Sequence, residues 1–313
     1  MSTTTWSGVE LRHLLALLAV ADEGTFSAAA ERLGYTQSAV SQQVGALERI
    51  VGASLFDRPG GPRPVRLTEA GDALVTHARA VLARLKTAEA DLRALATGEQ
   101  GVLRVGTLQS IGTKVLPAVL RRSMSEHPGV EIVLRESHDP LELLRLVEEG
   151  DLDITFSPLP VAGGPYETRW VLDDPFVFVA AADAPEAGQG RIALTDIVDL
   201  PLIGTRNSIC LRSIEECFRG LGAEPRFVFN SDDNPTIQGC IAAGLAYGLL
   251  PVLTVDEADR SVRVLSVDPA PEPRRIGLVW HAERRPPPAQ QAFVDAVTAV
   301  CAALNDRWRS NAA

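Results

Sequence analysis

A group of uncharged, hydrogen-bonding side chains near the N-terminus has the chemistry needed to read DNA bases. Gln37, Ser38, Ser41 and Gln42 lie in the stretch TQSAVSQQVGAL, where helical spacing brings them to one face. Glutamine can make a bidentate contact with adenine in a major groove, and serine can donate or accept a hydrogen bond there. This face therefore predicts contact with base edges of double-stranded DNA.

A helix, a tight turn and a second helix would position this face. The first helix has apolar residues three to four positions apart: Phe26, Ala29, Ala30 and Leu33. Gly34 is placed to end it in a left-handed conformation, and Thr36 can cap the next helix through its hydroxyl group. The second helix has an inward apolar stripe: Val40, Val44 and Leu47. The pattern is typical of a helix-turn-helix, and a surface pair of helices with solvated glutamines is the alternative.

The residues after Leu47 are typical of a small hairpin that bears arginines. Leu55 and Phe56 can close the core of the helix-turn-helix, and GGP at residues 60–62 makes a turn between two extended pieces. Three arginines on or beside this wing would contact the phosphate backbone or enter a minor groove: Arg58, Arg63 and Arg66. Solubility alone is the alternative role for each of them.

A long helix follows, and its apolar residues repeat in heptads. One set recurs at strict sevens: Leu67, Leu74, Val81, Ala88 and Leu95. A second set lies between them: Ala70 or Gly71, Ala78, Leu85 and Leu92. Such a repeat favours a coiled coil that holds two winged units together as a dimer. Packing within the same chain is the alternative.

Size and composition exclude several classes of protein. With 313 residues, 46% of them hydrophobic, the chain can form two or more domains. No apolar run approaches the about 18 residues that span a membrane, and residues 1–24 contain charges where a signal peptide would be apolar. We therefore expect a cytoplasmic protein. The four cysteines form no CxxC pair or metal-ligand cluster, so we expect neither a metal nor another cofactor.

The charge distribution leaves DNA binding open despite an acidic chain. Residues 1–97 hold ten of the 30 Lys/Arg and ten of the 40 Asp/Glu residues, so the net charge of −10 lies entirely in residues 98–313. A neutral N-terminal region can still present local arginines to phosphate, although a basic one would be stronger evidence.

Beyond a glycine-containing joint at residues 97–101, the sequence alternates between strands and helices. We expect strands at 101–107, 130–137, 151–156, 175–181, 226–230, 247–251 and 276–281, with further extended segments within 192–204. Helices are expected at 115–124, 140–149, 211–221, 235–243 and 289–308. This alternation indicates α/β architecture with a parallel sheet covered on both faces, and the plan occurs twice.

The N-terminal motifs resemble those of the LysR-type transcriptional regulators. The resemblance rests on ELRHL, GTFSAAAERL, TQSAVSQQVGALE, LFDR and VRLTEAG, in this order within residues 10–71. One departure is GGP before Arg63, which lengthens the wing. The resemblance implies a winged helix-turn-helix that reads a partly palindromic operator. By position, Gln37, Ser38, Ser41 and Gln42 would face bases, and the residues on the backbone would be Thr36, Arg58, Arg63 and Arg66.

The same resemblance implies three parts. These are a winged helix-turn-helix at 1–66, a linker helix for dimerisation at 67–97, and an effector-binding domain at 98–313. The last would have two α/β lobes, resembling periplasmic binding proteins: lobe I at about 101–173 plus 277–313, and lobe II at about 174–276. Crossover strands near 172–178 and 276–280 would join the lobes around a cleft.

Loops beyond the carboxyl ends of the strands supply candidate effector contacts, because ligands of such sheets bind there. The candidates are Gln109, Ser110, Ser137, Thr205, Arg206, Asn207, Asn234 and Thr236. Arg206 would suit a carboxylate and favours an anionic effector. Helix capping is the alternative role of Ser110, Asn234 and Thr236.

Cys210 and Cys217 fall where peroxide-sensing relatives carry a redox pair, although their spacing is shorter by two residues. Seven helical residues span about 10.5 Å, which is too long for a disulfide without unfolding a turn. We interpret both cysteines as packing residues, with thiol-based redox sensing as the alternative.

The sequence thus predicts a DNA-binding transcription regulator, active as a homodimer or homotetramer, that responds to a small-molecule effector. RNA polymerase is a further partner consistent with this role. An enzyme is not expected, because the chain has no GxSxG, P-loop, HExxH or dinucleotide-binding motif. A cytoplasmic solute-binding protein is a weaker alternative, which the N-terminal module contradicts.

Overall fold

The computed structural model describes residues 6–57, 65–97, 101–205 and 209–312. The chain folds as two compact units, Met1–Ala90 and Asp91–Ala313. Among the described residues, no helix combines the length and the apolar character needed to cross a bilayer.

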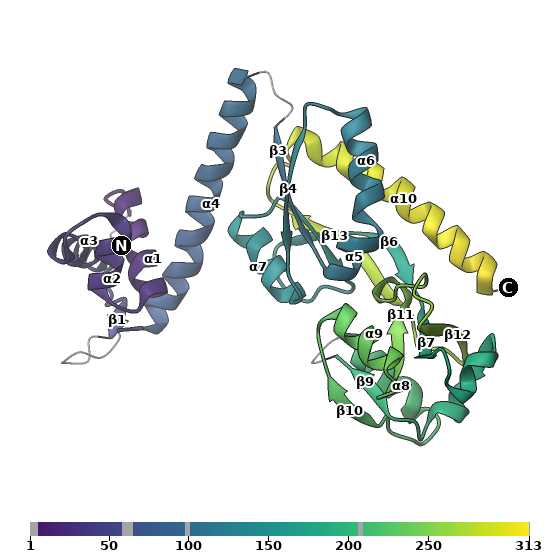
Figure 1. Ribbon diagram of the computed structural model, residues 1–313. Helices are drawn as coiled ribbons and strands as arrows, with labels where there is room; N and C mark the ends of the chain where they lie inside the picture. Colours follow the sequence, from purple (N-terminus) through teal and green to yellow (C-terminus); the bar gives the residue numbers. More distant parts are fainter. Residues whose placement is uncertain (1–5, 58–64, 98–100, 206–208, 313) are drawn as a thin grey trace. The chain divides into compact units, whose positions relative to one another are not determined.

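The first unit is a winged helix-turn-helix (Figure 1). Its helices are α1 (Leu11–Glu23), α2 (Phe26–Leu33), α3 (Gln37–Val51) and the start of α4 (Glu69–Thr97), and its hairpin pairs β1 (Phe56–Asp57) with β2 (Arg66–Leu67). The predicted inward stripe of α3 is confirmed, because Val40, Val44 and Leu47 are fully buried. They pack with Leu17, Ala29 and Phe56 in one core.

Helix α4 has two kinds of apolar residue along the predicted heptad repeat. Leu74 and Ala78 are buried in the core of the winged unit. Further along, Val81, Leu85 and Leu92 are 48%, 50% and 67% exposed. The first part of the repeat therefore belongs to the fold of this unit, whereas Val81, Leu85 and Leu92 present apolar side chains on the helix surface.

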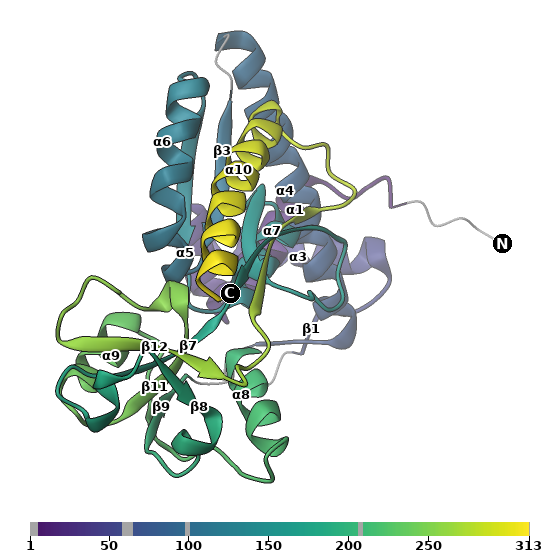
Figure 2. The ribbon, with the colours of Figure 1, turned by 90° about the vertical axis from the view of Figure 1, so that its right-hand side faces the viewer.

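The second unit contains two sheets, each in its own lobe (Figures 1 and 2). In lobe I the strand order is β4-β3-β5-β13-β6. The strands are β3 (Val102–Thr107), β4 (Glu131–Glu136), β5 (Ile154–Pro158), β6 (Tyr166–Asp174) and β13 (Arg274–His281). The helices are α5 (Gln109–Lys114), α6 (Leu116–Glu126), α7 (Pro140–Glu149) and α10 (Pro288–Ala312), and α6 and α10 lie side by side in Figure 2. Phe156, Leu172 and Phe293 are among the buried residues of this lobe.

In lobe II the strand order is β10-β9-β11-β7-β12-β8. The strands are β7 (Phe176–Ala181), β8 (Arg191–Ala193), β9 (Leu202–Gly204), β10 (Phe227–Asn230), β11 (Tyr247–Pro251) and β12 (Val262–Asp268). Helices α8 (Ile209–Arg219) and α9 (Asn234–Ala242) cover them, with 3-10 turns η1 (Pro185–Gly188), η2 (Leu194–Ile197) and η3 (Val252–Thr254). Phe178, Phe218 and Leu249 are buried on one side of this sheet, and Val179, Ile203 and Ile241 on the other.

The sheets are mixed, whereas the sequence predicted a parallel arrangement. β3 runs parallel to β4 and β5, but β13 is antiparallel to β5 and β6. In lobe II, β7 is antiparallel to β11 and β12. The reason is connectivity: β6 leads into β7, and β12 into β13, so the chain crosses between the lobes twice, and β7 and β13 run antiparallel to both of their neighbours.

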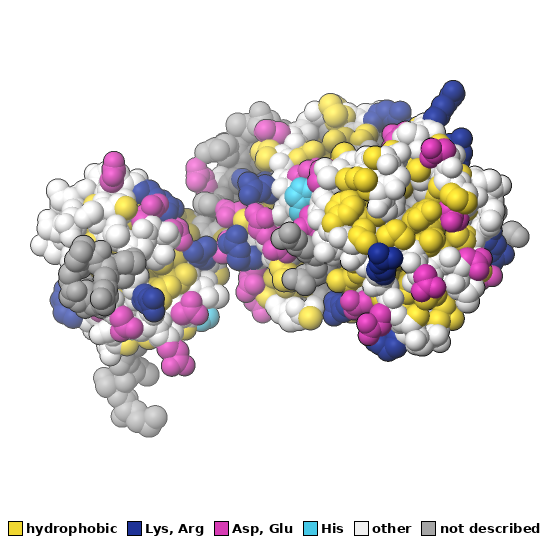
Figure 3. Space-filling view, turned by 60° about the horizontal axis from the view of Figure 1, so that its bottom comes forward, with side chains coloured by type: hydrophobic (Ala, Val, Ile, Leu, Met, Phe, Trp, Pro, Cys, Tyr) yellow, Lys and Arg dark blue, Asp and Glu magenta, His cyan; other side chains and the backbone are white. Residues whose placement is uncertain are grey.

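Hydrophobic side chains remain on the surface of the second unit. Figure 3 shows a broad hydrophobic area on the face that it displays. Exposed large hydrophobic residues of lobe II include Leu221, Val228 and Leu245, at 41%, 43% and 62% exposure. Extended apolar surface of this kind is characteristic of interaction sites.

Candidate DNA-binding face and inter-lobe site

The turn before α3 is fixed by two local caps. Gly34 is left-handed with φ 69°, and its N–H donates to the carbonyl groups of Ala30 and Glu31. Thr36 Oγ1 accepts a hydrogen bond from the Ala39 N–H at 3.2 Å. It also lies 3.0 Å from Ser38 Oγ. The predicted cap of α3 is confirmed, and the Thr36 hydroxyl in addition orients Ser38.

The outer face of α3 presents the side chains expected to read bases. Gln37, Ser38 and Gln42 are exposed, and Ser41 is half-buried. They occupy the side of the helix that is not used by the buried stripe at Val40. Because residues 37–43 carry no charge, this face offers hydrogen bonds rather than attraction to phosphate.

The strands of the wing are attached to the helices of the winged unit. Phe56 pairs with Leu67 and Asp57 with Arg66, which is exposed. The Val65 N–H donates to the Gly24 carbonyl at 3.0 Å, which attaches this hairpin to the end of α1. Of the three predicted wing arginines, Arg66 lies on β2, while Arg58 and Arg63 fall outside the described residues.

In the second unit, Gln109 connects the two lobes. It is the first residue of α5 in lobe I, and its Nε2 donates to Asp233 Oδ1 at 3.1 Å. Its Oε1 accepts from the Asn234 N–H at 3.0 Å. Asp233 caps α9 of lobe II, so both ends of the Gln109 amide are bound at the start of that helix.

The carboxylate of Asp233 is held in its ionised form. Hydrogen bonds from Thr236 and then from Gln109 lower the pKa of Asp233, and the charge of His138 acts in the same direction. Thr236 contributes through its hydroxyl at 2.6 Å and its N–H at 2.9 Å. The structure thus brings together Gln109, Asn234 and Thr236 of the predicted effector residues.

The other predicted effector residues have different surroundings. Ser137 is nearly buried, and its hydroxyl donates to Glu142 and accepts from the Asp139 N–H. The hydrogen bond from Ser137 is the main cause that lowers the pKa of Glu142. Thr205 is half-buried directly after β9. Arg206 and Asn207 fall outside the described residues.

A buried ion pair lies where the chain crosses between the lobes. Arg274, at the start of β13, donates from Nε to Asp174 Oδ2 at 3.0 Å, and its guanidinium also donates to Ser110 Oγ at 3.0 Å. Burial raises the pKa of Asp174, and Arg274 and the Leu253 N–H oppose that shift. Burial disfavours the charge of Arg274, but Asp174 and Cys210 outweigh it and raise the pKa of Arg274. Ser110 therefore belongs to a buried network.

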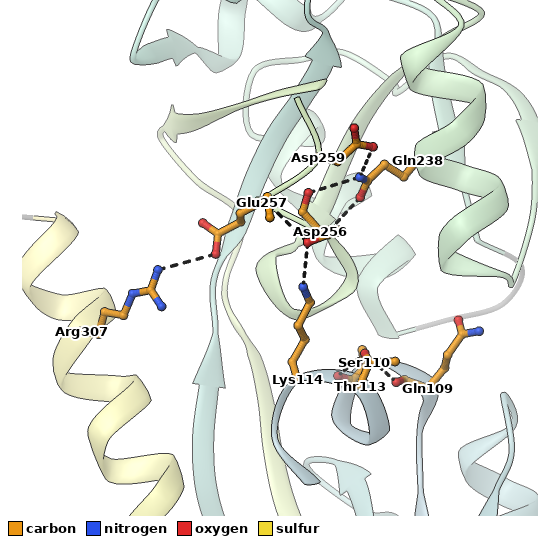
Figure 4. Close-up of polar contacts among 10 residues, drawn as sticks. Gln109, Ser110, Thr113, Lys114, Gln238, Asp256, Glu257, Asp259 and Arg307 are labelled. Carbon is orange, nitrogen blue, oxygen red and sulfur yellow. Dashed lines mark hydrogen bonds and ion pairs between the residues drawn. The ribbon is translucent and has the colours of Figure 1, made fainter. Parts of the chain in front are cut away.

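A second set of contacts joins α5 to the turn after η3 (Figure 4). Lys114 Nζ lies 3.3 Å from Asp256 Oδ1. The buried Gln238 of α9 holds this turn, because its Oε1 accepts from the Asp256 N–H at 2.8 Å and its Nε2 donates to Asp259 at 2.8 Å. Helices α5 and α9 are thus linked directly through Gln109 and indirectly through the Asp256 turn.

Several residues of these networks were not predicted from the sequence: Asp174, Asp233, Gln238, Asp256 and Arg274. A signal existed for Asp233, because aspartate before Asn-Pro is typical of a helix cap. The sequence gives no sign that Arg274 would meet Asp174, since the partners are separated by 100 residues.

The two candidate redox cysteines differ in environment. Cys210 lies in the first turn of α8, and its interaction with Arg274 is one of the causes that raise the pKa of Arg274. Cys217 lies two turns later, where burial raises the pKa of its thiol, and its Sγ donates to the Pro269 carbonyl at 3.9 Å. Cys210 thus has a cationic neighbour, whereas Cys217 is stabilised as a neutral thiol.

Comparisons with known proteins agree with this arrangement. The bacterial regulatory helix-turn-helix family of lysR type matches residues 11–72, and the LysR substrate binding domain family matches residues 96–302. A probable hydrogen peroxide-inducible genes activator of Mycobacterium avium is 34% identical over 275 residues, covering 86% of this chain and 87% of the relative.

Solved structures share the fold along nearly the whole chain. CbnR, a LysR family transcriptional regulator solved in complex with its target DNA, matches with a TM-score of 0.68 at 23% identity, covering 93% of this chain and 100% of CbnR. Full-length OxyR of Pseudomonas aeruginosa matches with a TM-score of 0.65 at 25% identity, covering 94% of each chain. The chain belongs to the LysR family of DNA-binding transcriptional regulators.

Proposed function

We propose that this protein binds a partly palindromic operator as a dimer or tetramer, with α3 in the major groove and the wing on the backbone. The observation that carries the proposal is the exposed, uncharged face of a capped α3, formed by Gln37, Ser38 and Gln42. Amide and hydroxyl groups in this setting match the donors and acceptors of base edges. Cytoplasmic localisation and the absence of catalysis are part of the same proposal.

The surface of α4 supports a dimer. Val81, Leu85 and Leu92 are exposed at heptad spacing beyond the part of α4 that is buried in the winged unit. An equivalent helix from a second copy would bury them. The hydrophobic area of the second unit in Figure 3 supports further contacts within a dimer or tetramer.

Binding to the intergenic DNA beside the gene tests the proposal. Fluorescence anisotropy over a range of salt concentrations should give a linear fall of log affinity with log salt, and footprinting should protect two half-sites. Affinity for this DNA no higher than for random DNA would contradict it.

We further propose that a small effector binds between α5 and α9. Gln109 now satisfies the Asp233 carboxylate and the Asn234 N–H, which a ligand with one donor and one acceptor could satisfy instead. A ligand can shift the equilibrium between two arrangements only if it binds them with different affinity. Releasing Gln109 from α9 supplies such a difference, because the inter-lobe contact and the ligand compete for the same groups.

A thermal-shift screen of small acids and amino acids tests the effector proposal. A true effector should raise the melting temperature of the protein and change its affinity for the operator. Asn234→Ala is not a useful probe of this site, because alanine keeps the main-chain N–H that binds Gln109. Gln109→Ala and Asp233→Asn are better probes, because they change side chains that make the contact. Both should alter the response, while a Gln291→Ala control on α10 should not.

A redox sensor that uses Cys210 alone is the second candidate. The observation in its favour is the electrostatic contact between Cys210 and Arg274, because a neighbouring cation favours a thiolate. A thiolate would attack peroxide, so that sulfur is oxidised to a sulfenic acid and peroxide is reduced to water. Mass spectrometry after peroxide treatment should find one added oxygen on Cys210 and none on Cys217. An unchanged peroxide response of operator binding in Cys210→Ser would rule this candidate out.

A further inference from the structure

A surface groove lies beside the proposed base-reading face of the winged unit. It has a volume of about 580 Å³ and runs between the start of α1 and the outer side of α3. Its lining consists of Arg12 and His13 from α1 and Ala39, Gln42, Gln43, Gly45, Ala46 and Arg49 from α3. Gln42 belongs both to this groove and to the proposed base-reading face, so the two surfaces are continuous.

The lining is cationic at the two sides of the groove. Arg12 and Arg49 are both exposed, and Arg49 is the sole Lys or Arg residue of α3. Arg12 pairs with Glu10 at 2.9 Å, but this pair is largely exposed and worth little. Arg49 donates to the Gly45 carbonyl of its own helix at 3.2 Å. No acidic residue is among the lining residues, so the groove is suited to an anion.

Gly45 leaves the floor of the groove open. No heavy atom lies within 4 Å of the position that a Cβ would occupy there. A glycine inside a helix is less favourable than alanine, and packing does not require one at this position. The open floor is explained if another molecule must approach the backbone of α3 closely.

The spacing along α3 points to DNA as that molecule. Ser38, Gln42, Gly45 and Arg49 are four, three and four residues apart, which places them on one helix face. Arg49 lies about 10 Å along the axis from Gln42, at 1.5 Å per residue. A major groove is about 12 Å wide, so a helix that reads bases with Gln42 brings Arg49 to the flanking phosphates.

We propose that Arg12 and Arg49 hold one strand of the DNA backbone in this groove, over Gly45. Guanidinium groups suit this task, because they can donate two parallel hydrogen bonds to a phosphate. This inference rests on the proposed reading of DNA by α3, and it adds the backbone contacts that a neutral unit needs.

Salt-dependent binding of the full-length protein to operator DNA tests the proposal. Arg49→Ala and Arg12→Ala should each weaken binding by about threefold to tenfold on every sequence, and each should reduce the salt slope by about 0.9. Arg49→Lys should keep most of the slope. Arg191→Ala is the matched control, because Arg191 is an exposed arginine of lobe II.

Substitution of Gly45 separates binding from folding. Gly45→Leu should keep or raise the melting temperature, because leucine favours helix and the space is open, yet it should weaken DNA binding about tenfold or more. Unchanged affinity and slope in all three alanine or leucine variants would overturn the proposal. So would a loss of transcription activation with unchanged DNA affinity, which would assign the groove to a protein partner. The sequence preference of Gln37→Ala is measured in parallel. A relaxed preference in this variant shows that α3 reads bases, whether or not Arg12 and Arg49 contact the backbone.

Discussion

Gln109 and Asp233 are 124 residues apart in the chain, yet the amide of one donates to the carboxylate of the other at 3.1 Å. This contact, with the bond from the Asn234 N–H, ties α5 of lobe I to the cap of α9 in lobe II. It is the most direct polar link between the two helices on which the proposed effector site is built.

Gln109→Ala should loosen this link. Loss of two partly buried hydrogen bonds, one of them to a charged group, should lower the free energy of unfolding of the second unit by about 1–3 kcal/mol. Urea denaturation and hydrogen exchange at the start of α9 would measure it. Gln291→Ala, which removes an exposed bond to Asp295 on α10, should change the free energy by about 0.5 kcal/mol or less. Equal effects in both variants would contradict the link.

The contribution of Asp233 should disappear only in acid. Its folded-state pKa is lowered, so its stabilising effect is present above the ordinary aspartate pKa and is lost as the pH falls through the lower, folded value. Melting temperatures of the wild type and Asp233→Asn should differ by a constant amount from pH 5 to pH 7, a window above the ordinary value of about 3.9. The difference should shrink at lower pH. A difference that shrinks already near neutral pH would assign the effect to another group, such as a histidine.

Arg274→Ala should be severely destabilising. It would leave the fully buried Asp174 without its guanidinium partner, at a cost of about 3–5 kcal/mol in the free energy of unfolding. The control is Arg191→Ala, which breaks an exposed pair with Asp268 and should cost about 0–1 kcal/mol. Chemical denaturation followed by circular dichroism measures both. Similar values for the two would mean that Asp174 is neutral in the folded protein.

Base reading and backbone contact should separate in two variants of the winged unit. Gln37→Ala should relax sequence preference at one position in each half-site, by about 1–3 kcal/mol of discrimination. Arg66→Ala should weaken binding to all sequences alike and lower the salt slope by about 0.9. Competition binding with a randomised operator library resolves the two effects. The reverse pattern would mean that the roles are exchanged.

Leu85→Asp should dissociate the proposed α4 dimer. The side chain is 50% exposed in the single chain, so the substitution should leave the fold of one copy intact while placing a charge in the helix seam. Sedimentation should show a smaller species, with operator affinity reduced far more than affinity for a single half-site. Glu89→Ala is a control on the same helix. A dimer that persists at micromolar concentration would show that other surfaces hold the copies together.

The local features of the fold could be predicted because they depend on residues close in sequence. The cap at Thr36, the left-handed Gly34 and the buried stripe at Val40 follow from spacing within a few residues. The strand at Tyr247–Pro251 and the helix at Pro140–Glu149 have the predicted bounds. Both elements could be predicted because their own residues contain a turn signal or a periodic apolar pattern.

Other features depend on partners that the local sequence does not specify. α5 has six residues, too few for an apolar period, so this segment was expected to be a loop. β12 was missed because it follows no simple alternation: Val262, Leu265 and Val267 are its buried residues. The direction of β13 and the meeting of Arg274 with Asp174 arise only when the chain returns to lobe I.

Helix α4 has a consequence for exchanging parts between regulators. Because Leu74 and Ala78 complete the core under α1 and α3, a winged unit cut at Leu67 would lose part of its own interior. A portable DNA-binding fragment would have to extend past Ala78, which belongs to this core. Such a fragment would also contain the first exposed apolar residues of the proposed dimer seam. Transferring the winged helix-turn-helix to another regulator would therefore transfer part of its preference for a dimer partner.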